Sequence, residues 1–557
     1  MTGSSALTSR RRFITTAGSV LVGAATATLA PSWAHAAQSV ANPRLRGEPF
    51  TLGVASGDPE PHSVVLWTRL APEPLHGGGM PDRPVPVQWQ VACDERFTCP
   101  VASGTEFARP EYAHSVHVEA GGLDPDREYF YRFRAGDRVS PVGRTRTAPP
   151  HDAATPVRFA VASCQNWQNG YFTPLAHLAD QDVAVVFFLG DYIYESKPHK
   201  KEYVRQHEGD GEPMTLEQYR NRYAQYRTDP NLQAAHANAP WVVTFDDHEV
   251  DNNYAADVPQ DPDDQSHKEF RKRRKAAMRA YFEHMPLRYR AHPHGAAMRL
   301  YRGLRFGRHV RVSVLDTRQY RSDQPRTLQE AKNPALSITG KEQERWLLDR
   351  LTDTSATWNL VANQAMIAQN DRLPGRDLLY DLDNWDGYRV QRRRLLSTLH
   401  EADAQNVVFM TGDRHSTWVC DLRPDFEDEK SPVVGAELTG TSISSGGNPD
   451  LAAFHSIFDP IKAKSPHWKF IDHQRGFLLC HADKDQLTTE LRVVSSVTQP
   501  KADGGTYATF VVESGRPGVE VRDVAPRPLL RLRGDPEMGP GGPLPLSTGW
   551  TDPRKWH

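Results

Sequence analysis

The stretch Val183-Ala184-Val185-Val186-Phe187-Phe188-Leu189-Gly190-Asp191-Tyr192-Ile193-Tyr194 predicts a buried strand followed by a tight turn. The run from Val183 to Leu189 is continuously apolar and rich in β-branched and aromatic residues, which is typical of a strand covered on both faces. Gly190-Asp191 is a common turn pair, and it places a carboxylate and two tyrosines directly after the strand.

Other apolar runs end in the same way, in residues that can bind a metal ion or a phosphate. They are Val157–Ser163 before Cys164, Trp241–Phe245 before Asp246-Asp247-His248-Glu249, Val310–Leu315 before Asp316, Trp358–Ala362 before Asn363-Gln364, and Val407–Thr411 before Gly412-Asp413-Arg414-His415. Carboxyl ends of parallel strands collect at one edge of a sheet, and sites form there. The six endings together therefore predict one site.

Each ending also has an ordinary structural interpretation. A cysteine after a strand is usually a small buried hydrophobe, Gly-Asp is usually a turn, and Asp-Asp-His can cap a helix. Taken together, these ordinary interpretations become less probable, because two acids, a thiol and two histidines would all need partners in one place.

Helix signals alternate with these strands. Thr215 with Gln218, Ser266 with Glu269, and Thr339 with Glu342 have the spacing of capping boxes, and Asp229 precedes Pro230 as an N-cap precedes a first-turn proline. The alternation predicts an α/β or layered α-β-β-α domain, which we place at residues 151–513.

Residues 42–150 predict a small all-β domain of the fibronectin or immunoglobulin type. Its strands are short and partly alternating, with Tyr129, Tyr131 and Phe133 on one face. Leu123–Tyr129 resembles a sandwich corner in which a tyrosine hydroxyl bonds to nearby backbone. Residues 147–150 are expected to be a linker, and residues 514–557, rich in Pro, Gly and Arg, an extended C-terminal strap.

Composition agrees with a folded chain of at least two domains. The 557 residues are 38% hydrophobic and 24% charged. The net charge of −2 gives no reason to expect a stable nucleic-acid partner or a membrane surface.

Residues 1–36 predict an export signal. Ser9-Arg10-Arg11-Arg12-Phe13-Ile14 precedes a weakly apolar run, and Ala34-His35-Ala36 has the form of a cleavage site. This pattern indicates a twin-arginine signal read by the Tat translocase; a general secretory signal is the alternative. The mature chain is expected to be periplasmic or extracellular and to have no transmembrane segment.

The five cysteines allow several arrangements in an exported protein. An odd number leaves at least one thiol unpaired or otherwise occupied. Cys93 and Cys99 are close enough in sequence to form a small disulfide loop, a pairing that the sequence leaves open.

Several familiar motifs are absent or incomplete. The chain has no Gly-x-x-x-x-Gly-Lys phosphate loop, and His248-Glu249 lacks the second histidine of a zinc helix. Gly440–Ser445 has Ser444 where a nucleophile elbow needs glycine, and Asp261–Ser266 lacks the glycine of a calcium loop. The basic run Arg271–Lys275 is expected to be a solvated helix face, with a phosphate-attracting patch as the alternative.

The motifs together resemble the alkaline phosphatase D family, which is related to purple acid phosphatases and other calcineurin-like metallophosphoesterases. The resemblance covers essentially the whole chain up to about Ser514. Its motifs are Gly53–Pro59, Leu66–Arg69, Ser163-Cys164, Gly190-Asp191-x-x-Tyr194, Asp246–Glu249, Asn384–Tyr388 and Gly412-Asp413-x-His415. It implies a four-layer metallophosphoesterase sandwich behind the all-β domain.

The resemblance also implies a metal centre of one ferric ion and one or two calcium ions. By this comparison Cys164, Tyr194 and His415 bind iron, and Asp191 bridges. The second metal takes Asp247, Asp413 and either Asn363 or Gln364, with Asp246 as a neighbour. His248, Asp247 and Arg414 are the expected catalytic residues. A tyrosine ligand requires a strongly acidic ion, whereas carboxylate and amide oxygens suit calcium.

The implied function is an exported, metal-dependent alkaline phosphatase and phosphodiesterase acting on phosphate mono- and diesters. A metal-bound hydroxide would attack phosphorus, and His248 would stabilise charge or protonate the leaving oxygen. Two alternatives remain: a phospholipase D-type phosphodiesterase with the same site, and an exported adhesion protein stabilised by metal.

Overall fold

The computed structural model describes residues 45–526, except 46, 199–203, 374–376 and 447–449. The predicted signal peptide and cleavage site lie outside these residues, as does the C-terminal part from residue 527. No helix in the described part of the chain is long and apolar enough to cross a membrane.

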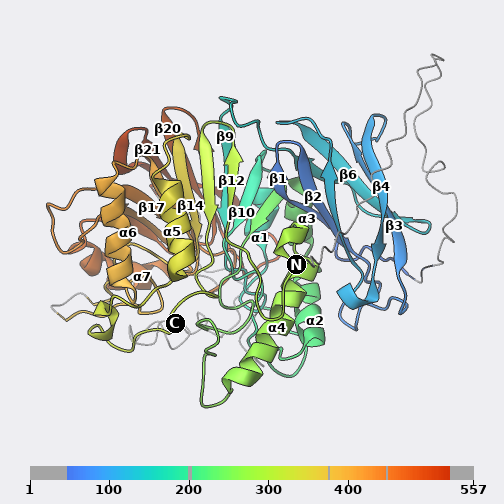
Figure 1. Ribbon diagram of the computed structural model, residues 1–557, viewed down its shortest axis with the longest axis horizontal. Coiled ribbons are helices and arrows are strands. Elements are labelled where there is room, and N and C mark those ends of the chain that lie inside the picture. The colour runs from blue at the N-terminus through green and yellow to red at the C-terminus, as the bar shows by residue number, and fades with distance from the viewer. Residues whose placement is uncertain (1–44, 46, 199–203, 374–376, 447–449, 527–557) are drawn as a thin grey trace, which may run out of the picture. The chain divides into compact units, whose positions relative to one another are not determined.

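A ten-stranded sheet runs through the molecule (Figure 1). Its spatial order is β22 (Arg516–Val524), β21 (Gly504–Glu513), β20 (Gln486–Val494), β19 (Gly476–Ala482), β9 (Val157–Ala162), β10 (Val185–Phe188), β11 (Pro240–Val243), β1 (Val54–Glu60), β2 (Ser63–Arg69) and β5 (Ser115–Gly121). The central strands β9, β10, β11 and β1 are parallel. The strand predicted from Val183–Leu189 is β10.

A seven-stranded sheet packs on the first. Its order is β12 (Arg302–Phe306), β13 (Val310–Val314), β14 (Trp358–Asn363), β15 (Val407–Thr411), β17 (Gly435–Thr439), β16 (Thr417–Leu422) and β18 (Trp468–Asp472). The core between the sheets includes Phe159 and Phe187 from one and Val312 and Leu360 from the other, all buried. Strands β13, β14, β15 and β17 are parallel, so this sheet also has a carboxyl-terminal edge.

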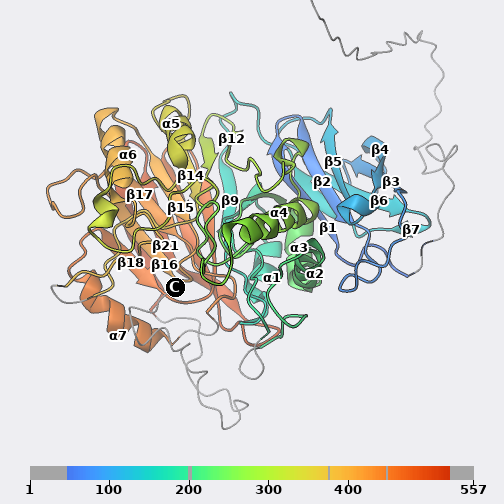
Figure 2. The ribbon, with the colours of Figure 1, turned by 60° about the horizontal axis from the view of Figure 1, so that its bottom comes forward.

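Helices cover the outer faces of both sheets (Figure 2). On the ten-stranded sheet these are α1 (Thr173–Ala179), α2 (Leu216–Arg227), α3 (Pro230–Asn238) and α4 (His267–His284); on the seven-stranded sheet they are α5 (Gly340–Leu351), α6 (Arg389–Glu401) and α7 (Leu451–Lys462). Apolar side chains of each sheet and its helices form a separate core. The four-layer α-β-β-α prediction is confirmed.

The N-terminal all-β part shares a sheet with the rest of the chain. Strands β3 (Val85–Ala92), β4 (Pro100–Ala108), β6 (Glu128–Ala135), β7 (Arg138–Val139) and β8 (Gly143–Arg146) form a third sheet, which packs on β1, β2 and β5. Strand β1 in turn pairs in parallel with β11, with Ser56 opposite Pro240. One layer of the sandwich is thus continuous with the ten-stranded sheet.

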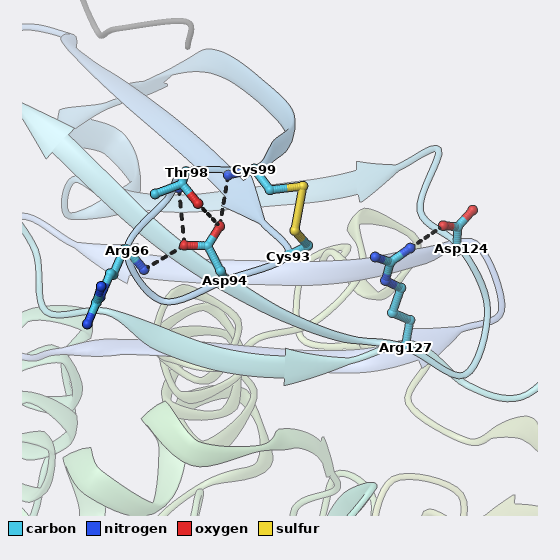
Figure 3. Close-up of a disulfide and its surroundings, with 7 residues drawn as sticks. All are labelled: Cys93, Asp94, Arg96, Thr98, Cys99, Asp124 and Arg127. Carbon is cyan, nitrogen blue, oxygen red and sulfur yellow. Dashed lines mark hydrogen bonds and ion pairs between the residues drawn. A yellow bond between two sulfur atoms is a disulfide. The ribbon is translucent and has the colours of Figure 1, made fainter.

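Local details of this part match the sequence. The backbone N–H of Asp124 donates to the Tyr129 hydroxyl at 2.9 Å, which is the predicted corner. Cys93 and Cys99, the first and last residues of the β3–β4 connection, form a disulfide (Figure 3). Inside this loop the Asp94 carboxylate accepts the backbone N–H groups of Arg96, Thr98 and Cys99.

Three helix starts agree with the sequence and one does not. Capping boxes at Thr215 and Ser266 and the Asp229 cap are present. Thr339 makes no side-chain cap, so that capping box is wrong. Its backbone is already helical in φ and ψ, which prevents a cap from forming, and its partner Glu342 instead accepts the Tyr301 hydroxyl.

Two further expectations need correction. Arg273 and Arg274 of the basic run are buried rather than solvated, because they pair with the carboxylates of Asp251, Glu212 and Asp257. The expected strap begins as strand β22, which pairs with β21 at the sheet edge.

Candidate metal centre

The predicted strand ends meet at one edge of the two packed sheets. In the ten-stranded sheet Phe188 of β10 lies opposite Ala162 of β9 and Val243 of β11, so all three strands end level with one another. In the other sheet Asn363 lies opposite Thr411, so β14 and β15 also end together. The residues that follow these strands are brought together in three groups.

Each group has three potential ligand atoms within 4.8 Å of one another. The groups are Cys164 with Asp191 and His415, Asp191 with Asp247 and His248, and Asp246 with Asp247 and Asp413. Asp191 and Asp247 each belong to two groups, so the arrangement is a continuous chain of ligands rather than separate clusters. Such a chain can hold adjacent cations that share a carboxylate.

Tyr194 closes the thiol end of this chain. Its phenolic oxygen donates to Asp191 Oδ2 at 2.7 Å and lies 2.9 Å from His415 Nε2 and 2.8 Å from the Ser445 hydroxyl. Burial, followed by the charge of Asp191, raises the pKa of both Cys164 and Tyr194 well above their ordinary values. A bound cation would reverse that rise, because it favours thiolate and phenolate.

The acidic end contains Asp246, Asp247 and Asp413. Arg318 is the buried cation beside them: its Nε donates to Asp246 Oδ1 at 2.5 Å, and its NH2 lies 3.5 Å from Asp247 Oδ2. Burial raises the pKa of Asp413 to about 7, and the charge of Asp247 adds to the rise although Arg318 opposes it. One arginine does not balance this many acids.

Unpaired oxygens test whether the residues fit metal ions. In the described part of the chain, Asp191 Oδ1, Asp246 Oδ2, Asp247 Oδ1 and Asn363 Oδ1 are buried and accept no hydrogen bond. Buried polar atoms are normally paired, so four such oxygens at one sheet edge indicate a missing partner. Hard oxygen donors of this kind are the ligands that calcium prefers.

The two amides at the end of β14 differ in this respect. Gln364 Oε1 accepts from the Thr317 N–H and hydroxyl, and Gln364 Nε2 donates to Thr244 Oγ1 and to the Leu315 carbonyl. Asn363 donates through Nδ2 to Ala365 and Thr411, but its Oδ1 has no partner among the described residues. Gln364 is therefore fully used by the fold, and Asn363 is not.

His248, a member of the middle group, is held by Glu195 and Tyr194. Its Nδ1 lies 2.7 Å from Glu195 Oε2, and its ring packs on Tyr194 with centroids 4.1 Å apart. Burial lowers the pKa of His248, but the charges of Glu195, Asp247 and Asp191 outweigh this and raise it well above its ordinary value.

The backbone at the ligands is unusual. Cys164, Asp191, Asp413 and His415 all have φ between 52° and 61°, in the left-handed region that non-glycine residues rarely adopt. Gly190, at φ 107°, has no room for a side chain, because a Cβ would lie 2.7 Å from the Asp246 nitrogen. Such conformations cluster at functional sites, where surrounding structure holds them.

Arg414 and Asp316, which the sequence also places after strand ends, belong to none of the three groups of possible ligands. Arg414 lies 3.3 Å from Asp381 Oδ2, and no described hydrogen bond links it to the three groups. Asp316 accepts the N–H groups of Arg318 and Gln319 and so shapes the loop that carries Arg318.

Sequence reasoning missed four supporting residues: Arg318, Glu249, Glu195 and Ser445. The Glu249 carboxylate accepts the N–H groups of Asp191, Tyr192 and Asp246, and thereby joins two strand ends. Its position inside Asp246–Glu249 was the available signal. Arg318 follows a predicted strand end by two residues, whereas Glu195 and Ser445 had no comparable signal.

Comparisons with known proteins agree with this architecture. A family model described as PhoD-like phosphatase matches residues 159–491, and one for the N-terminal domain of PhoD-like phosphatases matches residues 34–149. The chain is 46% identical over 521 residues to alkaline phosphatase D of Bacillus subtilis (strain 168), covering 92% of this chain and 88% of that protein.

Solved structures give the same result. The structure of PhoD matches with a TM-score of 0.83 and 46% identity, covering 87% of this chain and 94% of that one. Purple acid phosphatase PPD1 from yellow lupin (Lupinus luteus) seeds matches with a TM-score of 0.51 and 12% identity over 84% of this chain and 74% of that one, which is a likeness of fold alone. The expected relation to this group of folds is confirmed.

Proposed function

The chain belongs to the PhoD-like phosphatase family, and from this premise we propose that it hydrolyses phosphate esters at the described sheet edge with bound metal ions. The observation that carries the proposal is the set of four buried oxygens without partners, next to a thiol, a phenol and an imidazole. An adhesion protein needs no such open set of ligands.

In this proposal Cys164, Tyr194 and His415 would hold a ferric ion, Asp247, Asp413 and Asn363 would hold one or two calcium ions, and Asp191 would be shared between the two sets. Thiolate and phenolate favour an acidic trivalent ion, and the oxygen donors favour calcium. When bound, the ions would supply Lewis acidity for attack of water on phosphorus.

Asn363 is preferred over Gln364 because only Asn363 has a free oxygen among the described atoms of the two side chains. Asp246 is assigned a secondary role, since one of its oxygens is held by Arg318. Arg414, adjacent to Asp413, remains a proposed catalytic residue that would contact substrate; its side chain is 10% exposed.

His248 is proposed to act on substrate rather than on metal. Because Glu195 holds Nδ1, the atom left to face a substrate is Nε2. A protonated Nε2 can donate a hydrogen bond to the phosphoryl group or a proton to the leaving oxygen.

Export through the Tat translocase to the periplasm or the exterior, after removal of residues 1–36, is also proposed. It is supported by the sequence around Arg10 and Arg11. Changing both arginines to lysine should leave folded precursor inside the cell, and normal export of that variant would argue for the general secretory route. Residues 42–150, 151–513 and 514–557 remain the proposed domain boundaries.

The activity is tested by initial rates on a phosphomonoester and a phosphodiester with the same leaving group, with and without a calcium chelator, across pH. We expect hydrolysis of both, an alkaline optimum and loss on chelation. Indifference to chelation or an acidic optimum would contradict the metal assignment. Choline release from phosphatidylcholine, faster than either reaction, would favour the phospholipase D alternative.

A further inference from the structure

The segment Gly440–Gly446, here called the serine loop, covers the thiol end of the centre. The Ile443 N–H donates to the Ser163 carbonyl at 3.0 Å, and the N–H groups of Ser444 and Ser445 donate to the Cys164 carbonyl at 3.3 and 3.2 Å. These bonds hold Cys164 in its left-handed conformation. The serine loop is therefore part of the site, although it is not a nucleophile elbow.

The Ser445 hydroxyl has one proton and two possible acceptors. Its oxygen accepts the Asn166 N–H at 3.0 Å and lies 2.8 Å from both the Cys164 carbonyl and the Tyr194 oxygen. The Cys164 carbonyl already receives two backbone N–H groups, so it does not need this proton. The hydroxyl can turn to Tyr194 without leaving a buried carbonyl unpaired.

The hydrogen bonds that the Tyr194 oxygen can make would change when Tyr194 binds a metal. As a phenol it donates to Asp191; as a phenolate it can only accept. The other described hydrogen-bond partners of its phenolic oxygen are Asp191 and His415, both assigned as ligands. Among the described residues that contact the Tyr194 oxygen, Ser445 is thus the hydrogen-bond donor that is not assigned as a metal ligand.

We propose that Ser445 is a positioning residue that donates a hydrogen bond to the phenolate oxygen of Tyr194 and so tunes the thiolate–phenolate metal site. The proposal rests on the assignment of Tyr194 as a metal ligand. Hydrogen bonds to ligand atoms orient them and support metal affinity, and a donor to a phenolate oxygen also stabilises the lone-pair electrons of that oxygen.

The segment Gln474–Gly476 joins the serine loop to His415: Gln474 and Gly476 bond to the loop, and Arg475 bonds to His415. The NH1 group of Arg475 donates to the His415 carbonyl at 2.8 Å and to the His473 carbonyl at 2.9 Å. The Thr441 hydroxyl donates to the Gln474 carbonyl at 2.6 Å, and the Gly476 N–H donates to Ser442. The loop is anchored on both sides, so the Ser445 hydroxyl is preorganised for Tyr194.

The test is the visible charge-transfer band of the iron-loaded full-length protein. Ser445→Ala should move the band to longer wavelength, because a phenolate without its hydrogen bond transfers charge at lower energy, and should weaken iron retention against a chelator. Ser444→Ala is the matched control: Ser444 is equally buried in the same loop, but its hydroxyl donates to the Asn166 carbonyl at 2.8 Å. Its band should stay at the wild-type position.

The outcomes separate the two levels of the proposal. A wild-type protein with iron but no such band would overturn the phenolate assignment, and this inference with it. A normal wild-type band that Ser445→Ala leaves unmoved, or that Ser444→Ala moves as far, would overturn the role of Ser445 alone. If Ser445→Ala does not fold, resonance Raman of wild-type protein decides: exchange into D₂O should shift the phenolate C–O stretch, and an unshifted stretch would overturn the hydrogen bond.

Discussion

Nδ1 of His248 lies 2.7 Å from Oε2 of Glu195, and Oε1 of the same carboxylate accepts the Asn252 N–H at 2.9 Å. The imidazole is therefore held by a carboxylate that is itself held by backbone. This arrangement fixes the orientation of the imidazole ring. It also determines that Nε2, rather than Nδ1, faces the centre.

His248→Ala should lower kcat by roughly 10²- to 10⁴-fold, the range for a lost general acid or base, while metal content stays near that of the wild type. Glu195→Gln should lower kcat by a smaller factor, because the amide keeps a hydrogen bond but not the charge. Kinetics and metal analysis on the same samples check both. Loss of metal from His248→Ala would make His248 a ligand instead.

Cys164→Ala should lose iron, the visible band and most activity while the far-ultraviolet circular dichroism stays unchanged. The reason is that a methyl group cannot bind a metal, whereas the serine loop still holds the backbone at this position. Cys420→Ala is the control, since Cys420 is also buried and free but lies in the core behind the seven-stranded sheet. A colourless and fully active Cys164→Ala variant would refute the assignment.

Asn363→Leu and Gln364→Leu should fail in different ways. The Asn363 variant should lose calcium and activity with little change in the free energy of unfolding of the metal-free protein. The Gln364 variant should lose stability instead, by about 1–3 kcal/mol for each group left without a partner. Calcium titration and urea unfolding separate the two. The reverse pattern would show that Gln364 faces the metal.

Arg302→Met should destabilise the protein by about 3–5 kcal/mol, because it leaves the buried carboxylate of Asp58 without its cation. Arg302 on β12 donates to Asp58 Oδ1 at 2.6 Å and to the Val243 carbonyl at 3.1 Å, and so joins both large sheets. Denaturant unfolding measures the effect. Arg305→Met, in the same strand but bonded to exposed Ser355, should cost less than about 1 kcal/mol. If both variants lost the same free energy of unfolding, the ion pair of Arg302 with Asp58 would not be the source of the stability.

The sequence was sufficient for the layers and for predicting that these strand ends meet at one edge. The ends of β9, β10, β11 and β15, at Ala162, Phe188, Val243 and Thr411, were readable because each apolar run soon gives way to polar residues, and parallel strands must place such ends together. The helix caps at Thr215, Asp229 and Ser266 were readable because their spacing is local.

Long-range contacts were not readable in this way. Nothing near Ser56 indicates that β1 pairs with β11, and nothing near Ser445 indicates contact with Tyr194. Thr339 has the spacing of a cap, but its backbone lies in the right-handed helical region and its side chain makes no cap, which local spacing does not reveal. The choice between Asn363 and Gln364 depended on Thr317 and Thr244, which come from other loops.

The pairing of β9 with β19 determines when this protein can complete its fold. Val161 of β9 lies opposite Leu478 of β19. The β9 edge of the central parallel strands is therefore paired by a segment that is far later in the sequence. During synthesis the ribosome releases β9, β10 and β11 long before their last neighbour exists, and an unpaired apolar edge is prone to aggregate. Folding dominated by such distant pairings is slow. The β9 edge therefore stays without its second neighbour until β19 emerges and closes it.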